Sequence, residues 1–82
     1  MSITHDSNNN QFTLQLEGLE GVLQYHLLGN DGVDFFRTYV PPALRGRGHS
    51  ERLVDAGLCW AREQSLNITA SCWYVTKRLD EG

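Results

Sequence analysis

The hydrophobic pattern of this 82-residue chain changes its period at Pro41-Pro42. Before the two prolines, apolar and polar residues alternate, which is typical of half-buried strands. From Gly48 to about Gln64 the apolar residues recur with the period of an amphipathic helix. Proline cannot donate a hydrogen bond to a strand ladder, so the pair marks the place where strand pairing ends. The chain is therefore expected to fold as several strands followed by a helix.

Three strands are expected in the first half of the chain. The alternation of Phe12, Leu14 and Leu16 predicts the first strand, and the other two cover Val22–Leu28 and Val33–Val40. Short glycine-rich turns separate them, so the three strands should form an antiparallel meander. Unbroken alternation would divide the third strand into two faces, with Phe35, Arg37 and Tyr39 on one face and Phe36, Thr38 and Val40 on the other.

Beyond the helix, Ile68–Cys72 predicts a short fourth strand and Trp73–Leu79 a final short helix. The helix between strands three and four makes those strands parallel through a right-handed crossover. The expected fold class is α+β, with a three-stranded antiparallel meander, a crossover helix, a parallel fourth strand and a short C-terminal helix. Trp60 and Trp73 are both expected to pack in the core.

A single small domain is expected over residues 12–82, because a chain of this length has room for only one thin core. Residues 1–11 are polar and lack the pattern of a signal peptide, so they are expected to form a flexible lead. No apolar run approaches the ~20 residues of a membrane span. Cys59 and Cys72 are too few for a disulfide scaffold and lack metal-ligand spacing. Free thiols, a cytoplasmic location and no metal site are therefore expected.

The segment Arg45-Gly46-Arg47-Gly48-His49-Ser50 joins the strands to the helix and predicts an anion-binding cradle. Its glycines let the backbone approach a ligand, and the first N–H groups of a helix favour anions. Its arginines add charge-assisted bonds to phosphate. Ligands of such sheets bind at the carboxyl ends of parallel strands. This position should bring the segment together with Tyr39-Val40 and Cys72-Trp73-Tyr74.

Two other interpretations of this segment remain at this point, a plain strand-to-helix turn and a nucleic-acid contact. The net charge of −3 argues against nucleic acid, because affinity for a polyanion depends on the phosphates that are neutralised. All seven basic residues lie between Arg37 and Arg78. Their distribution indicates a local positive face and not a generally basic protein.

The order of these residues resembles the small stand-alone GNAT-like acyltransferases, which look like a GNAT core reduced to its acetyl-CoA-binding half. The resemblance rests on Val40-Pro41-x-x-x-Arg45-Gly46-x-Gly48, the helix after it, and Cys72-x-Tyr74-Val75, and it covers roughly residues 12–79. Ala43 stands where the general GNAT phosphate-loop pattern has Gln or Arg. The resemblance implies an acetyl-CoA-dependent N-acetyltransferase that acts on an amine.

The resemblance also implies which residues bind acetyl-CoA. The pyrophosphate would bind the backbone N–H groups of the glycine-rich segment, and the pantetheine arm would pair with the end of the third strand. Ser50 would either contact the ligand or cap the helix. The expected cofactor-binding residues are Thr38, Tyr39, Val40, Arg45, Gly46, Arg47, Gly48, His49 and Ser50.

By the same resemblance the thioester would lie between the third and fourth strands, near Cys72. A backbone N–H at the end of the third strand would polarise its carbonyl. Tyr74 would either protonate the departing CoA thiolate or simply pack. Cys72 would be a transient acyl acceptor or a buried hydrophobe. Its activation would need a lowered pKa, for which Lys77 or Arg78 is the nearest cation.

The chain carries no acidic residue just before the Val-Pro pair, where relatives often have one and where this chain has Arg37-Thr38-Tyr39. Direct attack by the amine is the expected mechanism, and a covalent step through Cys72 is the alternative. A second function remains open on the same residues, that of a non-catalytic CoA-binding or sensing module. An open sheet edge would also allow two copies to pair as a homodimer.

Overall fold

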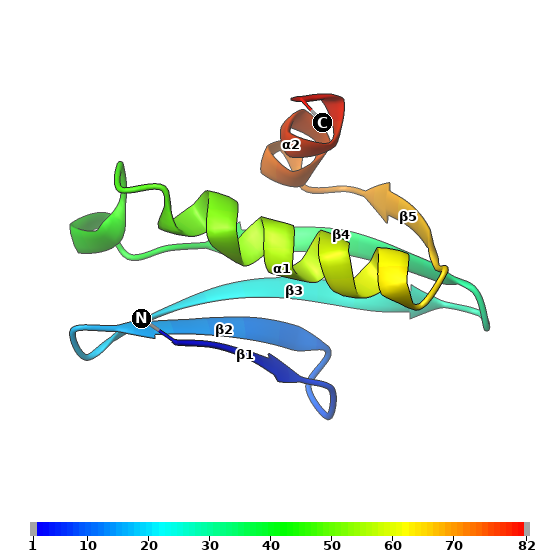
Figure 1. The fold of residues 1–82 in the computed structure, drawn as a ribbon, viewed down its shortest axis with the longest axis horizontal. Coiled ribbons are helices and arrows are strands. Elements are labelled where there is room, and N and C mark those ends of the chain that lie inside the picture. Colours follow the sequence, from blue (N-terminus) through cyan, green and yellow to red (C-terminus); the bar gives the residue numbers. More distant parts are fainter. Residues whose placement is uncertain (1, 82) are drawn as a thin grey trace.

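The computed structural model describes residues 2–81, with side chains described through residue 79, and its centre is a five-stranded sheet (Figure 1). The strands follow the order of the chain: β1 (Ser2–Asp6), β2 (Gln11–Leu16), β3 (Leu19–Leu28), β4 (Gly32–Tyr39) and β5 (Asn67–Ala70). Strands β1 to β4 are antiparallel, and β5 joins β4 in parallel. The predicted α+β class, meander and parallel last strand are confirmed.

Two helices complete the fold. After a short 3-10 turn, η1 (Pro42–Leu44), the crossover helix α1 (His49–Glu63) runs across β2, β3 and β4, and α2 (Trp73–Glu81) lies beyond β4 beside β5 (Figure 1). Both helices were predicted, with ends within a few residues. Within residues 2–81, neither helix has the length and apolar character to cross a lipid bilayer.

Residues 2–6 differ from the expected flexible lead, because they form β1 and pair with β2. An aromatic cluster holds this strand. The His5 ring stacks on the Phe12 ring with 4.2 Å between their centres, and its Nε2 lies 2.7 Å from the Tyr25 hydroxyl. The Trp60 ring of α1 packs edge-on against His5, with 4.7 Å between the ring centres. Burial lowers the pKa of His5, which favours the neutral ring in its contact with the Tyr25 hydroxyl. A polar segment gives no strand signal by hydropathy, so only the partners reveal this strand.

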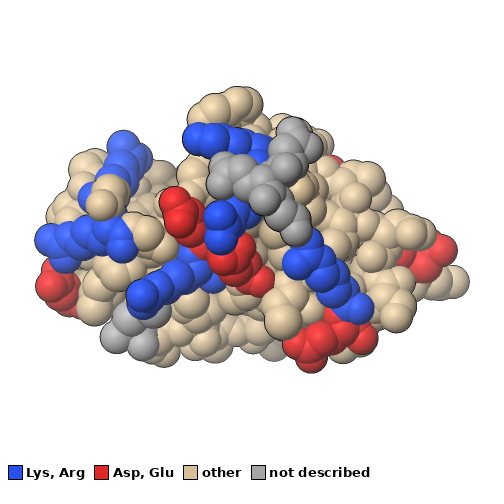
Figure 2. All heavy atoms as spheres, turned by 45° about the horizontal axis from the view of Figure 1, so that its top comes forward, with Lys and Arg blue, Asp and Glu red and all other residues tan. Residues whose placement is uncertain are grey.

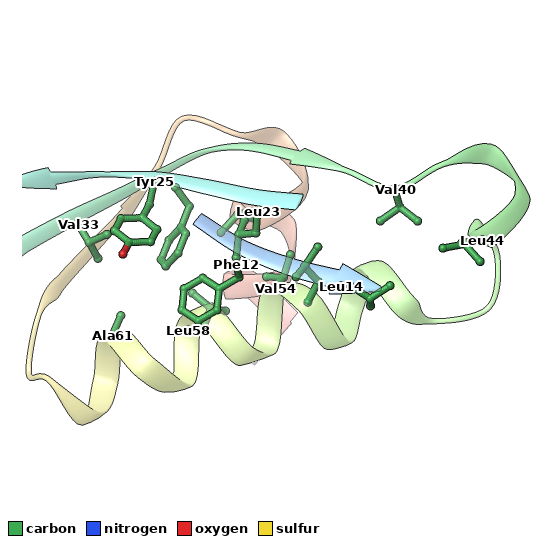
Figure 3. Packing of buried hydrophobic residues seen from close by; sticks show 13 residues of the cluster. Phe12, Leu14, Leu23, Tyr25, Val33, Val40, Leu44, Val54, Leu58 and Ala61 are labelled. Atoms are coloured by element: carbon green, nitrogen blue, oxygen red, sulfur yellow. The ribbon is translucent and has the colours of Figure 1, made fainter. Parts of the chain in front are cut away.

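The core lies between α1 and the sheet, and Figure 3 shows its side chains pointing into that space. Its members are Phe12, Leu14, Leu23, Tyr25, Val33, Phe35, Val40, Leu44, Leu53, Val54, Leu58, Ala61 and Val75. The predicted apolar stripe of α1 is confirmed, and Trp60 packs against the core. The expectation for Trp73 was wrong: it is 73% exposed, because α2 directs Val75 to the core and leaves Trp73 at its surface.

Strand β4 contains a bulge, which unbroken alternation did not predict. Its register against β3 shifts between Gln24 and Tyr25, and Phe36 is left opposite no partner. An extra residue turns over the side chains that follow it. Phe35 and Val40 therefore both face the core, although the alternating pattern placed them on opposite faces.

Gly57 lets α1 approach the sheet closely. A Cβ at this position would lie 2.5 Å from Leu23 Cδ2 and 3.0 Å from Phe35 Cε1. Gly57→Ala would gain about 1 kcal/mol in helix propensity, but overpacking would remove about 1–3 kcal/mol. We expect a net decrease in the free energy of unfolding, measured by urea denaturation.

A double-mutant cycle tests whether this contact is the cause. Leu23→Val removes the Cδ2 atom that the new Cβ would meet. The double variant should therefore be destabilised by less than the sum of the two single changes. A Gly57→Ala variant as stable as the parent would show that the close approach does not require glycine.

Candidate functional site

A groove of about 270 Å³ lies beside the end of β4. Its lining residues are Thr38, Tyr39, Val40, Arg45, Ser50 and Tyr74. The groove forms because β5 pairs with β4 only from Gly32 to Phe35, after which the two strands separate. The last links are the N–H groups of Ser71 and Cys72, which both donate to the Phe35 carbonyl. Beyond this fork, β4 offers backbone N–H and C=O groups to an extended ligand.

The segment between η1 and α1 brings backbone donors to this groove. Gly46 and Gly48 have φ angles of 79° and 80°, in the left-handed region that favours glycine. The first bond of the helical ladder is donated by the N–H of Arg52 to the Gly48 carbonyl. The N–H groups of residues 49–51 precede that bond, so the positive end of α1 presents donors to an anion.

The structure separates the two arginines of this segment. Arg45 turns toward the groove: its Nε donates to the Val40 carbonyl at 2.8 Å, and its guanidinium carbon lies 5.8 Å from the centre of the Tyr39 ring. Arg47 turns to the β2–β3 turn, where it lies 3.6 Å from the Glu17 carboxylate. The Arg45 side chain can therefore reach a ligand in the groove, whereas the Arg47 side chain is directed to Glu17 and is not among the residues that line the groove.

Ser50 and Tyr74 connect the two helices across the groove. Ser50 Oγ donates to the Tyr74 hydroxyl at 3.1 Å. Because the Tyr74 oxygen accepts this bond, its own proton remains available to donate. The N-cap of α1 is Gly48, so Ser50 does not cap the helix. The neighbouring His49 has a buried Nδ1 with no hydrogen-bond partner among the described residues.

Cys72 lies at the fork, immediately before α2. Its Sγ is 3.6 Å from Thr38 Oγ1 on β4. Burial raises the pKa of this thiol, but the N–H groups of Val75 and Tyr74 and the Thr38 contact stabilise the thiolate, and the net effect lowers the pKa. The N-terminus of a helix is a well-known setting for a reactive cysteine.

The expected activating cations lie elsewhere. Lys77 Nζ is 5.6 Å from the centre of the exposed Trp73 ring. Arg78 donates two hydrogen bonds to the Asp55 carboxylate, at 2.9 and 2.8 Å, and so links α2 to α1. The prediction that Lys77 or Arg78 activates Cys72 was therefore wrong, because backbone N–H groups and Thr38 stabilise the thiolate instead.

A polar cluster next to the fork was not predicted from the sequence. The carboxylate of Asp34 on β4 contacts the hydroxyls of Thr69 and Ser71. Asp34 and Thr69 lie 35 positions apart in the chain. Only the parallel register, which pairs Asp34 with Thr69, brings them together.

Charges are mixed on the face that carries the helices. Figure 2 shows Lys and Arg side chains spread over this face with Asp and Glu between them. This arrangement offers single anions local partners, whereas nucleic-acid-binding domains present a continuous basic surface.

A second hollow, of about 540 Å³, lies at the β2–β3 hairpin. Although it is larger than the groove, two of its lining residues are Glu17 and Glu20, which would repel a phosphate group. The hairpin is also separate from the fork and from Cys72. The smaller groove beside β4 is therefore the candidate site.

Comparison with known proteins yields one family and several relatives. Residues 11–81 match the family described as GCN5-related N-acetyl-transferase. Protein NATD1 of Gallus gallus is 37% identical over 83 residues, which cover 99% of this chain and 76% of that protein. Protein NATD1 of Homo sapiens is 38% identical over 81 residues, covering 96% and 72%. Protein NATD1 of Danio rerio is 34% identical over 83 residues, covering 99% and 76%.

We expect the pKa values of the two cysteines to differ from that of an ordinary thiol in opposite directions. The Glu63 carboxylate, 3.1 Å from the Cys59 thiol, raises the pKa of Cys59 from its ordinary value, whereas the pKa of Cys72 is lowered. Because the thiolate is the nucleophile, the alkylation of Cys72 by iodoacetamide should reach its midpoint at a lower pH than the alkylation of Cys59. The measurement compares Cys59→Ser, which leaves Cys72, with Cys72→Ser, which leaves Cys59.

Thr38→Val provides the control. It removes the hydroxyl beside Cys72 and should move the midpoint of Cys72 upward, with no effect on Cys59. Equal midpoints for the two thiols, or the reverse order, would contradict this assignment.

Proposed function

Since the chain belongs to the GCN5-related N-acetyltransferase family, we propose that it binds acetyl-CoA in the groove beside β4 and transfers the acetyl group to an amine. One observation carries the proposal: a strand edge, a glycine-rich segment and a helix N-terminus meet at one groove. Cys72 and Tyr74 lie beside this groove, where they contact Thr38 and Ser50, although α1 and β5 stand between them and β4 in the sequence.

The donors at the start of α1 suit a pyrophosphate. The N–H groups of residues 49–51 precede the helical ladder, and the Arg45 guanidinium lies on the same groove. Gly46 and Gly48 leave open space, since a Cβ on either would meet no described atom within 4 Å. Arg47 would contribute its backbone N–H, because its side chain is turned to Glu17.

The edge of β4 suits the amide-containing arm of the same ligand. Residues 38–40 follow the bulge and lie beyond the last β4–β5 pair. An extended chain with amide groups can pair with such an edge as another strand would. In this position the arm would lead from the start of α1 toward the fork and Cys72.

The bound co-substrate would supply an acetyl group that is already activated as a thioester. In direct transfer, the bond from the amine nitrogen to the acetyl carbon forms while the carbon–sulfur bond breaks. A backbone N–H at the end of β4 would orient the carbonyl. Tyr74 would give its hydroxyl proton to the departing thiolate, solvent would take the proton lost by the amine, and the Tyr74 phenolate would then take a proton back from solvent.

The non-catalytic alternative, a CoA-binding or sensing module, is favoured by one observation. The residues that line the groove include no carboxylate to serve as a general base.

Both thiols are free, which suits a reducing compartment such as the cytoplasm. The acceptor stays a prediction, and it would be a lysine side chain, an N-terminus or a small polyamine. Pairing of two copies of the chain also stays a prediction.

Binding of CoA is tested by isothermal titration. Arg45→Gln should weaken the affinity for CoA and acetyl-CoA about tenfold, which equals ~1.4 kcal/mol for one charge-assisted contact. Arg62→Gln, at the last turn of α1, removes the same charge far from the groove and should bind like the parent. A parent chain that binds neither ligand, or an Arg45→Gln variant that binds equally well, would contradict the cradle.

Transfer is tested by mass spectrometry of a mixture of amines incubated with acetyl-CoA and the protein. Tyr74→Phe should lower the rate roughly 100-fold while CoA affinity stays close to that of the parent. Cys72→Ala should retain turnover if the amine attacks directly and lose it if the acetyl group passes through Cys72. Tight CoA binding by the parent without any acetylated amine would favour the sensing module.

A further inference from the structure

A carboxylate on the sheet face opposite α1 joins β4 to the segment that leaves β5. Val33 and Phe35 are buried beneath α1, so Asp34, which lies between them, projects from the other face. Its Oδ1 accepts a hydrogen bond from Thr69 Oγ1 at 2.8 Å, and its Oδ2 accepts one from Ser71 Oγ at 2.9 Å. Each oxygen of the Asp34 carboxylate therefore accepts a hydrogen bond from a different residue of the segment that includes β5.

The backbone holds the same junction from inside the sheet. The Phe35 carbonyl accepts the N–H of Ser71 at 3.0 Å and that of Cys72 at 3.2 Å. The two side-chain bonds of Asp34 and these two backbone bonds surround the point where β4 and β5 separate. They fix both the position and the direction of the chain as it enters α2.

We propose that Asp34 is a positioning residue, which sets the fork between β4 and β5 and thereby holds Cys72 against Thr38. An ionised carboxylate only accepts hydrogen bonds, so both hydroxyls must donate to it and their orientations are fixed. Such charge-assisted bonds are roughly twice as strong as neutral ones. Asp34 is not among the residues that line the groove, so it acts through Cys72.

The role of Asp34 in acetyl transfer rests on the proposed function, but the arrangement itself can be measured on the thiol. The groups that stabilise the Cys72 thiolate are Thr38 on β4 and the N–H groups of Tyr74 and Val75 on α2. The titratable or charged side chains described on these two elements are Asp34, Arg37 and Tyr39 on β4 and Tyr74, Lys77 and Arg78 on α2. If the junction loosens, the thiol loses the hydroxyl and the backbone N–H of Thr38 across the fork, and its pKa rises. The N–H groups of Tyr74 and Val75 follow Cys72 directly in the chain and stay with it.

A purely electrostatic role of Asp34 would have the opposite sign. A carboxylate near a thiol disfavours a second negative charge, so its removal by itself would lower the pKa of Cys72. The direction of the shift therefore separates a positioning residue from a nearby charge.

The experiment uses the Cys59→Ser chain, in which Cys72 is the only thiol. The rate of alkylation by iodoacetamide is followed against pH, with thermal unfolding as the measure of folding. Asp34→Ala should move the midpoint upward and slow alkylation near neutral pH roughly threefold or more, the change produced by half a pKa unit. Asp34→Asn can still bridge the two hydroxyls through its amide, so it should stay close to the parent.

Asp31→Asn is the matched control for charge. Asp31 lies at the other end of the β4–β5 pair, where its backbone carbonyl accepts the N–H of Asn67 at 2.7 Å. This change removes one carboxylate but leaves that bond, so the midpoint should not rise. Should Asp34→Ala fail to fold, Thr69→Val and Ser71→Ala each remove one arm of the bridge and should each give part of the rise.

Two results would overturn the proposal. One is an Asp34→Ala midpoint that is unchanged or lower, with unchanged single-arm variants. The other is an Asp34→Asn variant that behaves like Asp34→Ala, because the bridge would then be irrelevant. Titration of the parent with CoA is independent of both results, so loss of CoA binding would refute the proposed function and leave the positioning of Cys72 intact.

Discussion

The unequal length of β4 and β5 is the constraint on which the candidate site depends. Strand β4 spans eight residues and β5 four, and their pairing ends at Phe35. Beyond it the end of β4 borders the groove, and α2 begins where another strand pair would otherwise continue. The bulge at Phe36 turns the side chains of the last part of β4, so that Val40 closes the core while its carbonyl accepts the Arg45 Nε–H.

Backbone dipoles provide much of the electrostatics of this site. The start of α1 offers N–H groups to an anion, and the start of α2 offers N–H groups to the Cys72 thiolate. Two of the side-chain cations have partners elsewhere, since Arg78 bonds to Asp55 on α1 and Arg47 lies near Glu17, whereas Arg45 lines the groove. A chain with a net charge of −3 can therefore hold two negative groups in one place without a basic surface.

Most elements were predictable from the sequence because their signals are local. The change of period at Pro41-Pro42 located the crossover helix, and the glycines at positions 46 and 48 indicated a backbone that only glycine adopts easily. Strand β1 and the exposure of Trp73 were not predictable in this way. His5 belongs to a strand because of its partners in β2, β3 and α1, none of which its neighbours in sequence reveal.

The amino-acid sequence by itself determined the order of strands and helices, the apolar face of α1 and the family to which the chain belongs, because each depends on residue type and short spacing. Only the tertiary structure decided which groups surround the Cys72 thiol, which arginine faces the groove and which hydroxyls Asp34 contacts. These properties depend on hydrogen bonds between residues far apart in the chain, such as those from Thr69 and Ser71 to Asp34. Their partners are set by the register of β4 against β3 and β5, and a single inserted residue at Phe36 changes that register.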